Sequence, residues 1–151
     1  MNRIIAYLFV LLHSIGSSPL TGIYGSKRHS WADYLPAIAA VESSNKQWAR
    51  SYLGEDFGRG LYGVSKICFE HWKWFHQDHW VVKQNLGPDC LYNTNVGREV
   101  AEWYLSYLDK YYSGHPDKIH LVLSAYNAGP THVDKYGIQH SYVEKVFAGL
   151  R

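Results

Sequence analysis

Apolar side chains recur at helical spacing along much of the chain, and no stretch shows a convincing alternation typical of a β-strand. Over residues 34–44, Leu35, Ile38 and Val41 return at every third position and predict a helix with one buried stripe. Asp33 precedes this run and is a residue type that caps helix N-termini. The sequence therefore predicts a first helix that begins just after Asp33.

The same periodicity predicts further helices. The clearest covers 95–112, where apolar and aromatic residues recur at spacings of three and four. Segment 45–65 is rich in glycine and polar residues, and we expect it to be loop-rich or to hold a small β segment. The remaining predicted helices cover 66–82, 116–126 and 141–149. The expected fold class is mainly α, in a single domain.

The first residues have the pattern of a secretion signal. Arg3 is followed by nine apolar or aromatic residues and then by a cluster of Ser and Gly. Nine residues are too few to span a bilayer as a helix, which needs about 17–25. We therefore expect a signal peptide over 1–18, a lead-in segment over 19–32 and one domain over 33–151. An uncleaved N-terminal anchor is the alternative; after cleavage, no stable membrane anchor is expected.

Aromatic residues make up 16% of the chain, with 13 Tyr and 6 Trp. Such rings either fill the core or line a cleft that stacks flat ligands such as sugars or bases, and composition does not choose between the two. The net charge is +2, and no basic run is longer than two residues. This is short of the concentrated basic face of a nucleic-acid-binding protein, so we expect no nucleic-acid partner.

The two cysteines, Cys68 and Cys90, would suit a disulfide in an exported chain, and two buried free thiols are the alternative. Their spacing is not that of a zinc site. His76 and His79 could face together on one predicted helix, but two histidines alone are weak evidence for a metal. We expect neither a metal nor a cofactor.

Glu42 stands out among the charged residues because it lies in the last turn of the apolar first helix. Apolar surroundings disfavour the charged carboxylate and raise its pKa. The negative end of the helix dipole acts in the same direction. A carboxyl that keeps its proton near neutral pH can act as a general acid, so Glu42 is the candidate catalytic residue.

Three segments in a fixed order support this assignment. Glu42 is followed by Ser43, a glycine-rich turn spans 60–64, and Ala-Tyr-Asn-Ala-Gly-Pro occupies 125–130. In order and spacing they resemble the soluble lytic transglycosylase (SLT) domain family, which has the lysozyme-like fold and is related to goose-type lysozymes. The resemblance covers residues 33–150 and implies a lysozyme-like, mainly α domain.

The resemblance also implies a reaction and a set of site residues. Family members cleave the β-1,4 bond between N-acetylmuramic acid and N-acetylglucosamine in peptidoglycan and leave a 1,6-anhydro-muramic end. Glu42 would protonate the leaving oxygen and then act as the base. The positions that the resemblance places at the substrate are Ser43, Leu61, Tyr62, Tyr126 and Asn127.

Gly63 departs from the family pattern, in which Gln is usual at this position and borders the cleft. The departure leaves open a non-catalytic glycan-binding or assembly role on the same fold. A hydrolytic lysozyme is the other alternative. It would need a second carboxylate, for which Glu55 and Asp56 are the candidates.

The expected location follows from the signal pattern and the implied substrate. An exported peptidoglycan-cleaving enzyme works in the periplasm or cell envelope, so the expected partner is the glycan strand of peptidoglycan. A secretion, conjugation or phage machine is an open candidate for a second partner.

Overall fold

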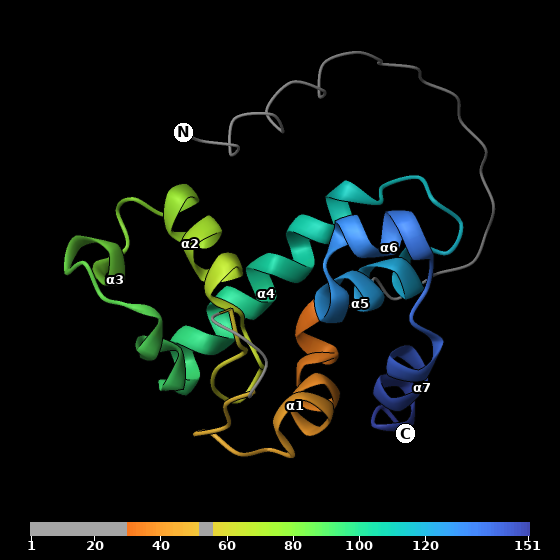
Figure 1. The fold of residues 1–151 in the computed structure, drawn as a ribbon, viewed down its shortest axis with the longest axis horizontal. Helices are drawn as coiled ribbons and strands as arrows, with labels where there is room; N and C mark the ends of the chain where they lie inside the picture. The colour runs from red at the N-terminus through yellow and green to blue at the C-terminus, as the bar shows by residue number, and fades with distance from the viewer. Residues whose placement is uncertain (1–29, 52–55) are drawn as a thin grey trace, which may run out of the picture.

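The computed structural model describes residues 30–51 and 56–151, and this part of the chain is mostly helical (Figure 1). Two isolated β-bridges are the only extended pairings among these residues, so the expected mainly α fold is confirmed. The predicted signal peptide over 1–18 and Glu55 lie outside the described residues. The elements are η1 (Trp31–Asp33), α1 (Leu35–Ser43), α2 (Lys66–Phe75), α3 (Trp80–Lys83), η2 (Pro88–Tyr92), α4 (Thr94–Tyr111), α5 (Lys118–Ala128), α6 (Pro130–Tyr136) and α7 (His140–Ala148).

Helix α4 is the central element. In Figure 1, α2 and α3 lie on one side of it, and α5, α6 and α7 lie on the other. Helix α4 packs against α2, α5 and α1, while α1 also packs against α7. The C-terminal end of α1 is thereby brought next to the last helix of the chain.

The apolar stripes that predicted the helices meet in one core. Ile38 of α1 and Leu105 and Leu108 of α4 are completely buried, as are Val122 of α5 and Val146 of α7. Full burial of one such aliphatic side chain is worth about 1.5–3 kcal/mol. The core therefore fixes α1 and α7 relative to each other, and the candidate site depends on that placement.

The prediction of a single helix over 66–82 is wrong, because the chain leaves the helical conformation at His76. The backbone there has φ −121° and ψ 48°, and α3 begins only at Trp80. The His79 side chain caps the new helix, since its Nδ1 accepts a hydrogen bond from the Val81 N–H at 3.3 Å. No glycine or proline marks this break in the sequence.

Two further differences concern helix ends. The helix predicted over 116–126 is α5 and ends at Gly129, and Pro130 then begins α6, a helix that the sequence did not predict. The fixed φ of proline suits the first position of a helix. Asp33 does not cap α1: its side chain accepts from the Ser30 N–H at 3.1 Å and closes η1, and α1 begins after Tyr34.

The described residues between α1 and α2 form a loop, as expected, and residues 59–64 make a tight turn within it. The Arg59 N–H donates to the Val64 carbonyl at 2.9 Å, and the Val64 N–H donates back at 3.2 Å. This pair closes a turn in which Gly60 and Gly63 have φ of 72° and 62°. Glycine adopts such positive φ without steric cost, so the shape of the turn depends on glycine at both positions.

Candidate active site

Glu42 lies at the C-terminal end of α1, where the chain turns away. Ser44 ends the helix in the left-handed conformation, with φ 52° and ψ 38°. The Glu42 side chain is partly buried. Burial raises its pKa, and hydrogen bonds from the side chains of Tyr142 and Asn127 offset part of the rise. The carboxyl therefore holds its proton to higher pH than an exposed glutamate does.

A tyrosine from α7 holds this carboxyl. The Tyr142 hydroxyl donates to Glu42 Oε1 at 2.7 Å, and Tyr142 is only 8% exposed. Burial and the neighbouring carboxylate raise the pKa of Tyr142, so its hydroxyl keeps its proton and remains a donor. Sequence analysis missed Tyr142, because the two residues are 100 positions apart and no motif marks the contact.

The glycine turn faces the other carboxyl oxygen. The Gly63 backbone comes so close that a Cβ built there would lie 2.7 Å from Glu42 Oε2. The turn is tied to α5, because the Tyr126 hydroxyl donates to the Tyr62 carbonyl at 2.8 Å. Tyr126 thus holds the turn, while the hydroxyl on the acid comes from Tyr142.

The other residues that the resemblance placed at the substrate make different contacts, and Asn127 is the one among them whose side chain is hydrogen-bonded to the carboxyl. Ser43 is buried, and its Oγ lies 2.8 Å from the carbonyl oxygens of both Ala39 and Leu61. A hydroxyl has one proton and donates to one of them at a time, so Ser43 joins α1 to the turn. Tyr62 is buried as well, whereas Asn127 is exposed and hydrogen-bonds the carboxyl through its side chain.

This arrangement suits a general acid, because one oxygen is held by a neutral donor and burial favours the protonated form. A sequence model of the Transglycosylase SLT domain matches residues 20–145, most of the chain. The chain belongs to the SLT transglycosylase family. Neither curated proteins nor solved structures give a match.

Membership of the SLT family supports a function of the lytic transglycosylase type, the cleavage of peptidoglycan in the cell envelope. The resemblance drawn from the three sequence motifs is thereby confirmed. Within the described part of the chain, no helix is both long and apolar enough to cross a membrane.

Asp56, a candidate for the second carboxylate of a hydrolytic lysozyme, is engaged in helix capping. Its Oδ1 accepts a hydrogen bond from the Ile67 N–H at 2.8 Å, at the start of α2. The side chains that act on the pKa of Glu42 are those of Tyr142 and Asn127, and both are neutral. The observed contact of Asp56 is therefore structural.

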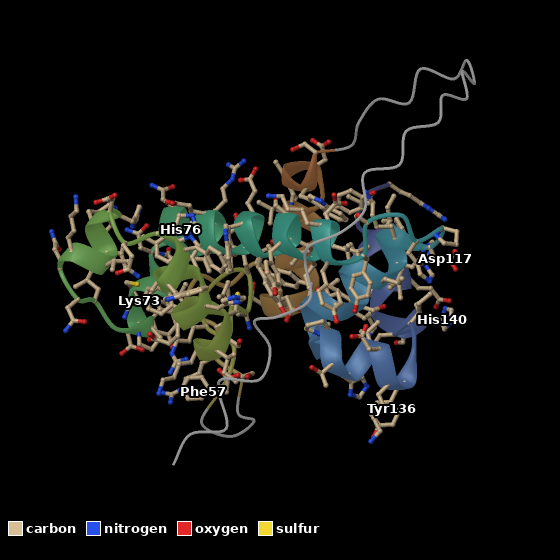
Figure 2. All side chains as sticks on the ribbon, turned by 90° about the horizontal axis from the view of Figure 1, so that it is seen from above. Phe57, Lys73, His76, Asp117, Tyr136 and His140 are labelled. Atoms are coloured by element: carbon tan, nitrogen blue, oxygen red, sulfur yellow. The ribbon has the colours of Figure 1, made fainter. Side chains whose placement is uncertain are left out.

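Cys68 is a buried free thiol and Cys90 a partly buried one, and a disulfide between them stays a prediction. Burial raises the pKa of both thiols, that of Cys90 to about 11, so both stay protonated. Among the described residues, no group of three or more His, Cys, Asp or Glu side chains could hold a metal ion. Figure 2 shows His76 and His140 toward opposite ends of the molecule.

Much of the aromatic content near α2 and α4 is packed ring against ring. The His71 ring stands edge-on to those of Trp103 and Tyr107, with centroids 5.4 and 5.0 Å apart. Phe75 contacts Trp103 as well, at 5.7 Å. These rings lie at the interface between the two helices, and Phe75 is 53% exposed. At the candidate site, the aromatic residues act through hydroxyl groups, those of Tyr126 and Tyr142.

Proposed function

We propose that this SLT domain is a lytic transglycosylase in which Glu42 serves first as acid and then as base. Its substrate is the β-1,4 bond between N-acetylmuramic acid and N-acetylglucosamine, and its product carries a 1,6-anhydro ring. The observation that carries the proposal is the state of the Glu42 carboxyl. It is partly buried, its pKa is raised, and the side chains that hydrogen-bond it are neutral.

The first step uses protonated Glu42. Because Tyr142 donates to Oε1, this oxygen is the acceptor of the pair, and the acidic proton belongs on Oε2. Oε2 gives its proton to the oxygen that links the two sugars. The bond from that oxygen to C1 of the muramic residue breaks, and N-acetylglucosamine leaves with the proton. Positive charge develops at C1, and the new carboxylate is stabilised by Tyr142 and Asn127.

The second step uses the carboxylate. Glu42 removes the proton from the 6-hydroxyl of the same muramic residue, and O6 attacks C1 to close the anhydro ring. Glu42 is protonated again at the end of the cycle, and no water is consumed. A single carboxylate suffices because the nucleophile belongs to the substrate.

The contacts of Asp56 favour this reaction over hydrolysis. A hydrolytic enzyme more often needs a second carboxylate to activate water or to stabilise charge. The Asp56 carboxylate accepts from the Ile67 N–H and caps α2. A purely glycan-binding role has less support, because binding alone does not require a carboxyl with a raised pKa.

Digestion of peptidoglycan tests the proposal. Purified protein is compared with Glu42→Gln, which keeps the side-chain size and an oxygen that can accept from Tyr142. We expect soluble muropeptides with anhydro ends from the wild type alone. Products with reducing ends, together with activity lost in Asp56→Asn, would indicate hydrolysis instead. Binding to peptidoglycan without release of any product would refute enzymatic function.

We also propose that the domain reaches the cell envelope as an exported protein, after removal of residues 1–18. The support is the charged, apolar and small-residue pattern of that segment. The N-terminus of protein from the envelope fraction is expected near Pro19. An intact N-terminal Met1 on that protein would contradict cleavage.

A further inference from the structure

We propose that Gly63 is a positioning residue for the reactive oxygen of Glu42, a role that its lack of a side chain makes possible. This inference rests on the proposed function, in which Oε2 delivers the proton. A Cβ built on Gly63 would lie 2.7 Å from Oε2, 3.0 Å from the Glu42 Cβ and 3.1 Å from its Cδ. Cβ atoms essentially never approach another heavy atom within 3.0 Å. Any side chain at position 63 must therefore displace either the turn or the carboxyl.

The turn is poorly placed to give way. The Tyr126 hydroxyl holds the Tyr62 carbonyl at 2.8 Å, directly before Gly63. The pair of backbone hydrogen bonds that closes the turn follows directly after it. The Gly63 carbonyl in turn packs on Gly58, where an added Cβ would lie 2.5 Å from the carbonyl oxygen. The backbone of Gly63 is thus restrained by the Tyr126 hydrogen bond to Tyr62, by the hydrogen bonds that close the turn, and by its packing on Gly58.

The Glu42 side chain is the element that moves. It has rotatable bonds and is only partly buried, whereas Tyr142 on its other side is 8% exposed and fixed in α7. Displacing the carboxyl changes both its burial and its 2.7 Å hydrogen bond to Tyr142. Because burial raises the pKa of Glu42 and this hydrogen bond lowers it, the displacement changes that pKa.

The contact with Glu42 gives a physical role to the glycine at position 63, where this chain departs from the family pattern. The SLT family usually carries Gln there, and its absence left open a role without catalysis. In this chain the Gly63 backbone, which has no side chain, instead packs directly against the Glu42 side chain. The glycine is therefore compatible with catalysis and defines where Oε2 lies.

Gly63→Ala tests this role, with Gly114→Ala as the matched control. Both glycines have positive φ, 62° and 84°, so alanine is strained at both positions. A Cβ at Gly114 meets no atom within 4 Å, whereas one at Gly63 meets Glu42. The difference between the two variants isolates the contact with the acid from the cost of the backbone. The readouts are kcat and KM on peptidoglycan, the pH–rate profile, and the pKa of Glu42 from a ¹³C NMR titration assigned with Glu42→Gln.

For Gly63→Ala we expect kcat to fall by about 100-fold, the scale of a misplaced catalytic group, with little change in KM. The pKa of Glu42 should differ from the wild-type value, and the high-pH limb of the profile should move with it. Gly114→Ala should keep the wild-type kcat and Glu42 pKa. Equal kcat and equal Glu42 pKa in the two variants would overturn the proposal. A wild type that forms no anhydro product would refute the proposed function instead, while the NMR comparison still tests the positioning.

If Gly63→Ala does not fold, as judged by circular dichroism, Gly63→Asn replaces it with Gly114→Asn as control. Asparagine enters the left-handed region more readily than alanine, yet it carries the Cβ that meets Glu42. A changed Glu42 pKa in Gly63→Asn alone would support the proposal. A folded Gly63→Asn with the wild-type Glu42 pKa would overturn it.

Discussion

Replacing Tyr142 by phenylalanine removes one hydrogen bond from the catalytic carboxyl and leaves the ring in place. The bond is short, 2.7 Å from the hydroxyl to Glu42 Oε1, and its donor is 8% exposed. A hydrogen bond to a charged group is worth about 1.5–3 kcal/mol. It favours the carboxylate, so it lowers the pKa of Glu42. With about 1.4 kcal/mol per pKa unit, Tyr142→Phe should raise this pKa by at most about 1–2 units.

Two effects on the reaction follow. Glu42 stays protonated to higher pH, so the high-pH limb of the pH–rate profile should move to higher pH. The carboxylate formed in the first step loses a stabilising donor, so the maximal rate should fall by about 10–100-fold, which is the same 1.5–3 kcal/mol expressed as a rate. Both quantities come from the release of soluble muropeptides measured across pH for the two proteins.

Tyr112→Phe is the matched control. The Tyr112 hydroxyl donates to Asp134 Oδ1 at 3.0 Å, and Tyr112 is also 8% exposed, but this pair joins α4 to α6. Tyr112→Phe should lose stability, as Tyr142→Phe does, because each loses a buried hydrogen bond. Tyr112→Phe should keep the wild-type pH–rate profile. The reasoning is refuted if the limb for Tyr142→Phe stays in place or moves to lower pH, or if Tyr112→Phe moves it equally.

Three further predictions follow from the same contacts. Folding raises the pKa of Glu42, so the wild type loses stability as pH rises through that pKa. Glu42→Gln has no such group to ionise and should therefore unfold at a higher temperature than the wild type at pH 7. This advantage should vanish below about pH 4, where Glu42 is protonated in both the folded and the unfolded state. Ser43→Ala should lose about 1 kcal/mol in urea unfolding, because its hydroxyl joins α1 to the turn; unchanged stability would contradict this role. Asp56→Asn should cost about 0.5–1 kcal/mol through weaker capping of α2, yet still release anhydro products.

The long helices could be predicted from the sequence because each carries its own apolar stripe. The predicted ranges 34–44 and 95–112 correspond to α1 (Leu35–Ser43) and α4 (Thr94–Tyr111). The break at His76 could not be predicted, since the apolar spacing continues across it and a histidine side chain supplies the cap. Helix α6 could not be predicted, because Gly-Pro is typical of a helix end, although proline also begins a helix well.

The candidate site was predictable to the extent that its residues lie in contiguous motifs. Glu42 ends an apolar helix, and Tyr126 belongs to a six-residue segment, so both were identified from the sequence alone. Tyr142 lies in a helix whose periodicity indicates only a packed face, and its role depends on how α7 meets α1. The contact of Gly63 with Glu42 likewise depends on how the turn packs on α1, which no local pattern contains.

Digestion of peptidoglycan in H₂¹⁸O tests most directly whether Glu42 works with a nucleophile from the substrate. If the 6-hydroxyl attacks C1, no solvent oxygen enters the product, and the muropeptides have the mass of anhydro ends without ¹⁸O. We predict this result for the wild type and for Asp56→Asn, with no release by Glu42→Gln. Muropeptides that carry one ¹⁸O at a reducing end would show that water is the nucleophile and would contradict the account.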